Sequence, residues 1–293
     1  MPIELWIDDG NPWYLSPDIW VVPGNDPSGA PGIPIAGVAG YVWARVHNRG
    51  TTQVTNATVR FYWANPSMVI TPNTATAIGT SFVSLLPGET KEVLCLTQWT
   101  PVWVNDGHEC LIAQAFHASD PLPPGGPNDP FDPPNDRHTA QRNIDLLIAR
   151  IRSNFLVQCF AAGNTARFRT EEVTVVARRA PIETIRNLGK TLGLDRLPRE
   201  MGEINEFGLQ PQRCGEQIER VGDEKLELKL KPGQQVGLAL TIRVKEDSES
   251  NTGALFLVEQ FVRDKLVGGI GVLALGGTKD CEQYKQERSH ENG

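Results

Sequence analysis

The sequence predicts an all-β protein organised as two successive β-sandwiches, with a short helical insertion in the second. Segments of alternating apolar and polar residues recur along the chain, and Gly, Pro, Asn and Asp fill the turns between them. A Pro-Gly turn followed by an alternating strand occurs at 84–99 and again at 228–244. A repeated element of this kind indicates two units built on one plan.

The first half of the chain is expected to form one domain over residues 1–150. All seven tryptophans lie before residue 104, which sets this half apart in composition. Ala57, Val59, Phe61 and Trp63 fall on one side of an extended chain, and we expect that side to face the core. Strands are predicted at 18–22, 40–48, 57–64, 79–85, 91–99, 109–118 and 142–147.

The second half, residues 151–276, repeats the strand pattern less regularly. Within 181–209, prolines followed by apolar residues at helical spacing predict two short helices. The polar segment 277–293 is expected to be a disordered tail. Strands are predicted at 154–161, 172–179, 225–230, 235–244, 254–262 and 266–275.

Composition and charge argue against several functional classes. The net charge is −7, the pI is about 5.3 and no basic stripe is visible, so a nucleic-acid partner is not expected. No apolar run has the length of a membrane-spanning helix, so membrane insertion is not expected. Asp8 and Asp9 stand where a secretory leader would be basic and then apolar. The compartment is therefore left open between the cytoplasm and leaderless export.

Four motifs of the first half are "VHNRGT" (46–51), "VTNATVRFYW" (54–63), "LLPGET" (85–90) and "CLIAQA" (110–115). Together they resemble the bacterial cell-adhesion-related, or CARDB-like, Ig-fold domains over roughly residues 14–147. The resemblance implies an Ig-like sandwich and an accessory, adhesion-type role on secreted or surface proteins. With the repeated turn, the predicted fold class is all-β, with tandem Ig-like β-sandwiches.

No cofactor is expected, and the chain is not predicted to be an enzyme. The glycines of 267–277 lie within an apolar strand pattern, whereas a phosphate-binding loop would follow a strand and open a helix. No serine or cysteine lies in a nucleophile elbow. The five cysteines lack zinc-binding spacing and are expected to be buried thiols, with a Cys95–Cys110 bridge left open.

A Pro/Asp-rich tract over residues 119–138 is the main functional candidate. Loops of this length are usually functional or disordered, and its prolines limit the entropy that it would lose on docking. We expect the tract to lie at the same end of the sandwich as the loop 48–56 and to bind a protein partner. The predicted partner-binding residues are Arg49, Trp103, Asp129, Phe131, Asp132 and Asp136, with Phe131 as the apolar anchor.

A non-enzymatic binding or assembly module is therefore the predicted function, and two alternatives stay open. The first is a carbohydrate-binding protein that stacks a surface glycan on exposed tryptophans. The candidate residues are Trp43, Trp63, Trp99 and Trp103. The second is a metal-dependent hydrolase that uses histidines and carboxylates in and beside the tract: His108, His117, His138, Asp120, Asp129, Asp132 and Asp136. Asp129, Asp132 and Asp136 are the calcium candidates, although the tract lacks EF-hand spacing.

Overall fold

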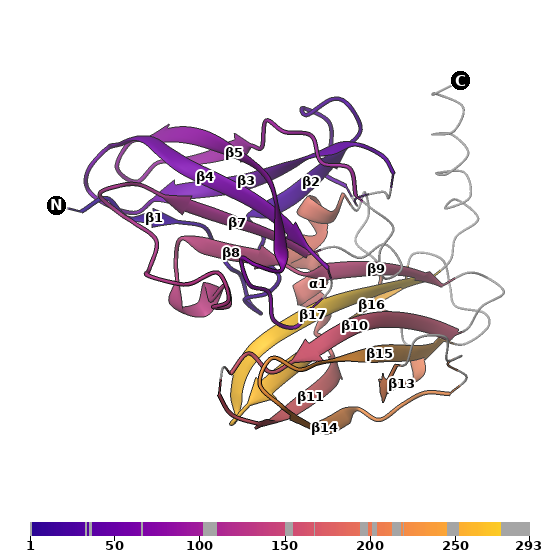
Figure 1. The fold of residues 1–293 in the computed structure, drawn as a ribbon. Helices are drawn as coiled ribbons and strands as arrows, with labels where there is room; N and C mark the ends of the chain where they lie inside the picture. Colours follow the sequence, from indigo (N-terminus) through magenta and orange to yellow (C-terminus); the bar gives the residue numbers. More distant parts are fainter. Residues whose placement is uncertain are drawn as a thin grey trace.

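The computed structural model describes residues 2–276 except 33, 35, 36, 66, 102–109, 150–154, 167, 194–198, 201–203, 213–217, 219 and 245–251. The described elements are almost all β-strands, with a single short α-helix, which confirms the all-β prediction. Two pairs of sheets follow one another along the chain and enclose separate hydrophobic cores (Figure 1). The expected tail at 277–293 lies outside the described residues.

The N-terminal sandwich is formed by two antiparallel sheets. In one, β3 (Gly40–Asn48) pairs with β1 (Leu5–Trp6), β2 (Ile19–Pro23) and β6 (Thr90–Leu94). The other has the order β5 (Ala75–Leu85), β4 (Val54–Ala64), β7 (Cys110–Phe116) and β8 (Thr139–Arg142). The predicted core face of β4 is confirmed, because Ala57, Val59 and Phe61 are fully buried between the sheets and Trp63 packs against them.

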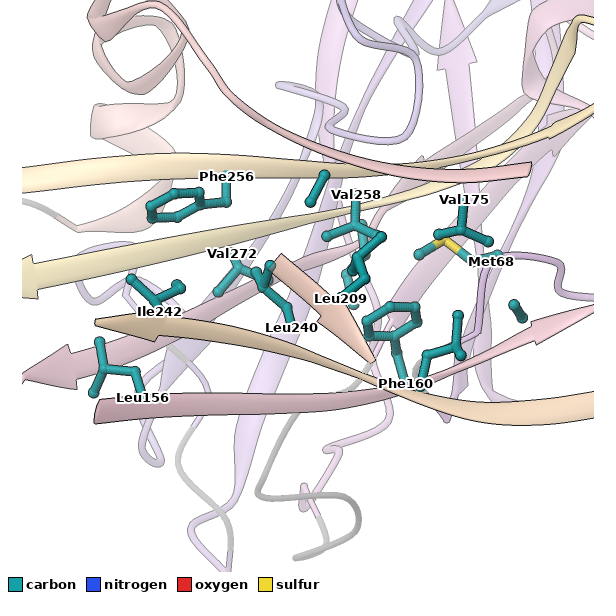
Figure 2. Packing of buried hydrophobic residues seen from close by; sticks show 14 of the residues in the cluster. Met68, Leu156, Phe160, Val175, Leu209, Leu240, Ile242, Phe256, Val258 and Val272 are labelled. Carbon is teal, nitrogen blue, oxygen red and sulfur yellow. The ribbon is translucent and has the colours of Figure 1, made fainter. Parts of the chain in front are cut away.

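The C-terminal sandwich packs a smaller sheet against a larger one. The smaller sheet has the order β10 (Phe155–Gly163), β15 (Gln235–Val244) and β13 (Ile204–Pro211). The larger has the order β14 (Lys225–Leu230), β11 (Glu171–Arg179), β16 (Thr252–Val262), β17 (Lys265–Gly276) and β9 (Ile144–Ala149), with β12 (Arg199–Glu200) beside β16. Figure 2 shows the core between them, in which Phe160 and Leu240 of one sheet meet Val175 and Phe256 of the other.

The strand predicted at 142–147 as the last of the first sandwich is corrected by the structure. Residues 139–142 form β8 and pair with β7, whereas 144–149 form β9 and pair in parallel with β17 of the second sandwich. The chain thus passes directly from one sheet to the other at Asn143 (Figure 1). The division into independently folding domains near residue 150 stays a prediction. A fragment that ends at residue 150 would contain β9, whose pairing partner β17 belongs to the C-terminal sandwich.

The helical insertion predicted at 181–209 is confirmed in its first part and wrong in its second. α1 (Ile182–Leu188) follows Pro181 and runs into the 3-10 helix η3 (Gly189–Leu192). The second predicted helix is instead the strands β12 and β13, and β13 pairs with β15. Phe207 and Leu209 alternate along β13 and face the core, so the period-2 pattern describes this segment better than helical spacing. None of the described helices is long and apolar enough to cross a membrane.

The two sandwiches are joined by side chains that the first inserts into the second. Met68, in the β4–β5 connection, belongs to the core of the C-terminal sandwich, where Figure 2 shows it among the labelled residues. Its N–H donates to the carbonyl of Ala161 at 2.9 Å. A Cβ at Gly268 would overlap the carbonyl oxygen of Met68, so a glycine is required there.

A second contact between the sandwiches is made by Tyr14. Its ring is fully buried against Gly269, where any Cβ would overlap it. The Tyr14 hydroxyl donates to Glu259 Oε1 at 3.0 Å, and Arg178 donates to both oxygens of that carboxylate at 2.7 and 2.9 Å. Burial, assisted by the Glu259 carboxylate, raises the pKa of Tyr14, so the phenol stays a hydrogen-bond donor. Gly268 and Gly269 of β17 therefore leave room for Met68 and Tyr14 of the first sandwich.

Arg142 ties the end of β8 to the helical insertion. Its guanidinium donates to the carbonyl of Ile19 at 2.6 Å, and to Oγ1 and the carbonyl of Thr191 at 2.8 and 3.1 Å. Burial lowers the pKa of Arg142 to about 10. These bonds fix η3 against β2, because a buried guanidinium needs its donors satisfied.

The free energy of unfolding is expected to fall as the pH rises from about 4 to 6, because of Asp9. Burial raises its pKa to about 6, with a further contribution from Asp8. The folded chain therefore binds a proton that the unfolded chain, with a pKa of 3.8, has already lost. Asp9→Asn should stabilise the protein at pH 7 by about 1 kcal/mol after allowance for solvent screening, and should flatten the pH dependence.

Urea denaturation at pH 5 and pH 7 measures this effect. Asp26→Asn is the control. A hydrogen bond from the Ser28 side chain lowers the pKa of that exposed carboxyl, so its removal should not stabilise the protein at pH 7. If Asp9→Asn shows the same difference in stability between pH 5 and pH 7 as the wild type, Asp9 is not the source of the pH dependence.

Candidate functional site

The tract 119–138 lies against its own sandwich. His117 and Asp120 exchange backbone hydrogen bonds in a turn, and Leu5 N–H donates to Asp120 Oδ2 at 2.7 Å while Leu5 pairs with Asn48. The base of the tract is thus at the 48–56 end, as expected. Its middle then packs against the β4–β5 connection, where Phe131 N–H donates to the Ile70 carbonyl at 2.9 Å.

Phe131 contacts the protein itself. Its ring centroid lies 5.6 Å from that of Tyr62, and it packs against a small cluster with Ile70 and Ile112. Ile112 points away from the main core and is nevertheless buried, because it lies in the cluster against which Phe131 packs. The predicted anchor for a partner is therefore engaged in holding the tract to the sheet.

The three acidic candidates are separately bonded within the tract. Asp129 accepts from Gly126 N–H at 2.8 Å, and Asp132 accepts at 2.8 Å from the Asn135 side chain. Burial by itself would raise the pKa of Asp136, but hydrogen bonds from His138 and Thr139 outweigh it and lower the pKa. Within the described part of the chain, no group of three or more His, Cys, Asp or Glu side chains is arranged to hold a metal ion.

The histidines of the hydrolase hypothesis do not form an open site where they are described. His138 is buried, with Nδ1 2.8 Å from Asp136 Oδ1 and Nε2 3.2 Å from Asp120 Oδ1. Arg137 also pairs with Asp120, so this network binds the base of the tract to β1. His117 Nδ1 accepts from Ser119 N–H at 3.1 Å in the same turn. His108 lies outside the described residues.

Arg49 is exposed and stacks on Trp6, with its guanidinium carbon 4.1 Å from the ring centroid. Trp103, the other predicted contact outside the tract, lies outside the described residues. Their roles in binding a partner stay predictions, as do those of Asp129, Asp132 and Asp136.

The tryptophans considered for sugar stacking are mostly covered. Trp99 is buried, and Trp63 packs against the core. Trp43 stacks in parallel on buried Trp20 at 6.1 Å and donates from Nε1 to the Pro27 carbonyl at 3.2 Å. A sugar ring needs an open aromatic face, and these contacts occupy one face of Trp43 and its polar edge.

Cys95 and Cys110 lie in separate hydrophobic clusters and are not joined by a disulfide. Cys110 donates to Asn143 Oδ1 at 2.7 Å, and the Asn143 side chain donates to the Gly269 carbonyl at 2.7 Å. The Cys110 thiol therefore helps to fix Asn143, the residue between β8 and β9.

The rest of the same outer face, on β5, β4 and the end of β7, carries aromatic side chains. Thr58 of β4 pairs with Phe82 of β5 and with Phe116 of β7, so all three point outward. Phe82 is 67% exposed. Arg60 lies over Phe116, with its guanidinium carbon 4.7 Å from the ring centroid, and pairs with Thr80. We call Phe82, Thr58, Phe116, Arg60 and Thr80 the Phe82 strip.

The Phe82 strip was missed from the sequence, although a signal was present. In "SFVSL" Val83 and Leu85 face the core, and the period of a strand then places Phe82 on the opposite face. The alternation that predicts this strand also identifies Phe82 as the apolar residue left on its outer face.

The sequence matches no protein-family model, and no curated protein matches it. Among solved structures, a CARDB domain from Pyrococcus furiosus in complex with di-metal ions is 16% identical over 48% of this chain and 84% of its own, with a TM-score of 0.27. The CupB6 tip adhesin from Pseudomonas aeruginosa is 12% identical over 89% of this chain and 99% of its own, with a TM-score of 0.24.

An enzyme is also among the similar structures. Red sea bream transglutaminase is 11% identical over 89% of this chain, with a TM-score of 0.22, and this chain spans 32% of its length. Because all three TM-scores are low, no site or activity is carried over from these structures. The CARDB-like resemblance of the first half stays a prediction.

Proposed function

We propose that this protein is a non-enzymatic binding module of the adhesion type, which binds a protein partner through the Phe82 strip. The observation that carries the proposal is the exposure of Phe82, which with Phe116 flanks Thr58 on the outer face of a sheet that Phe131 of the tract covers in part. Apolar patches rimmed by polar residues are typical of protein interaction sites.

The composition of the strip favours a protein partner. Aromatic residues and arginine are enriched where interfaces are strongest, and Arg60 already lies on the ring of Phe116. Within the described residues Arg60 pairs with no carboxylate, so its charge is available to one on the partner. The fitting partner presents an apolar side chain to Phe82 and a carboxylate to Arg60.

The tract 119–138 has a supporting role in this proposal. Phe131 covers the outer face beside Tyr62 and Ile112, so the tract borders the strip on that side. A partner bound to the strip meets the tract beside Tyr62, and this contact limits its orientation.

Affinity capture with the full chain tests the proposed function. Proteins captured from the native host by the wild type are compared with those captured by Phe82→Ala and by Arg60→Glu. A partner of the strip is expected to be lost in both variants, with a fall in affinity of about tenfold or more for Phe82→Ala. Phe168→Ala is the matched control, because it removes an exposed phenylalanine from the other sandwich. Equal capture by wild type, Phe82→Ala and Arg60→Glu would overturn the proposal.

A further inference from the structure

The C-terminal sandwich ends in a group of loops that carry an exposed aromatic residue and several cations. Phe168, in the β10–β11 loop, is 93% exposed. The β14–β15 loop (231–234) and the turn at Arg263 and Asp264 lie at the same end. We propose that these loops, the Phe168 tip, bind the surface of a membrane that contains anionic lipids.

The loops of the Phe168 tip are held together by hydrogen bonds. Asn164 N–H donates to the Gln234 carbonyl, and Gly233 N–H donates to the Asn164 carbonyl, both at 2.9 Å. The buried side chain of Asn164 donates at 2.9 Å to the carbonyls of Arg169 and Leu230. Phe168 therefore projects from a loop whose two ends are fixed, which lowers the entropy lost when it inserts.

The charge of the tip is opposite to that of the whole chain. Exposed basic residues outnumber acidic ones there, although the net charge of the protein is −7. Glu171 is buried and shared by two arginines, since Arg169 pairs with its carboxylate and Arg263 Nη2 lies 3.3 Å from Oε1. The charged residues of these loops and of the adjoining strand ends are Arg169, Glu171, Glu172, Lys229, Lys231, Arg263, Asp264 and Lys265.

The turn between β16 and β17 carries an arginine at the tip although the backbone there has a left-handed conformation. Arg263 and Asp264 have φ values of 51° and 64°, in the left-handed region that favours glycine and asparagine. Asn-Gly would form this turn with less strain, but it would not carry a guanidinium. The choice of arginine agrees with a function for its charge.

The exposure of Phe168 favours a lipid surface over an acidic protein. Almost the whole Phe168 side chain lies in water. A single projecting aromatic flanked by cations suits the interface of an anionic bilayer, where the ring enters the headgroup region and the cations stay among the lipid phosphates. This contact is peripheral and requires no membrane-spanning segment.

Vesicle co-sedimentation of the full chain tests the proposal. The wild type is expected to bind vesicles of phosphatidylcholine mixed with phosphatidylserine at low salt, to bind pure phosphatidylcholine vesicles much less, and to dissociate as salt is raised. Phe168→Ala should reduce the vesicle partition constant about tenfold, since it removes the inserting ring. Phe168→Trp should retain binding, and Arg263→Asn should weaken it on the mixed vesicles alone.

Two controls distinguish the Phe168 tip from the Phe82 strip. Phe82→Ala is expected to leave vesicle binding unchanged, so failure of this proposal is distinct from failure of the Phe82 strip. Melting temperatures of all variants confirm that each is folded. No binding of the wild type to mixed vesicles, or equal binding by Phe168→Ala, overturns the proposal. Binding of soluble polyglutamate that depends on Phe168, without vesicle binding, overturns it in favour of an acidic protein partner.

Discussion

Phe61→Ala is expected to lower the free energy of unfolding by about 3–5 kcal/mol. The ring is fully buried on the inner face of β4, between the two sheets of the N-terminal sandwich. Truncation to alanine leaves a cavity that neighbours on paired strands, among them Ala113, are too constrained to fill. Urea denaturation of the full chain, followed by tryptophan fluorescence, measures the change.

Phe82→Ala supplies a control of the same chemistry on the neighbouring strand. Phe82 points outward and is mostly exposed, so its truncation should change the free energy of unfolding by less than about 0.5 kcal/mol. A loss below about 1 kcal/mol for Phe61→Ala, or equal losses for the two variants, would mean that the inner and outer faces of this sheet are assigned wrongly.

Gly269→Ala is expected to destabilise the protein by about 1–3 kcal/mol, because the new methyl group overlaps the ring of Tyr14. Tyr14→Ala should by itself cost about 3–5 kcal/mol, since it empties a buried site between the sandwiches. With the ring removed, however, Gly269→Ala should become nearly neutral. The two substitutions are thus expected to be strongly non-additive.

A double-mutant cycle in urea measures this coupling. Gly125→Ala is the control, because nothing lies within 4 Å of the position of its Cβ, and it should be neutral in either background. Additive effects of Tyr14→Ala and Gly269→Ala would show that Tyr14 does not pack against β17, and the contact between the sandwiches would then have to be revised.

Most of the strands were predictable because alternation is a local property. β3, β4 and β15 carry apolar residues at every second position, and the face that alternation assigned to Phe61 is the buried one. The Pro-Gly turns also depend on local backbone preference, as Gly88 and Gly233 have φ values of 73° and 68°. α1 was predictable from Pro181 and the spacing of Ile185 and Leu188.

The errors fall where the partner of a segment decides its structure. The segment 142–147 is predicted as one strand, yet it is divided between β8 and β9, which belong to different sandwiches. The Asn143 side chain is bonded to Cys110 of the first sandwich and to Gly269 of the second. Likewise, 204–211 contains spacing that fits a helix, and pairing with β15 makes it a strand. Neither partner lies nearby in the sequence, so no local pattern distinguishes the alternatives.

Local sequence pattern was sufficient to establish the all-β class, the period of most strands and the Pro-rich tract at 119–138. The fold was needed to establish which apolar residues of the N-terminal sandwich remain exposed: Phe131 packs against Tyr62, and Phe82 lies in water. Burial of a side chain depends on what packs over it. Phe131 lies in the tract that follows β7, and the fold of that tract brings its ring back over Ile112 of β7. Strand period is fixed by neighbours in the sequence, whereas exposure is fixed by neighbours in space.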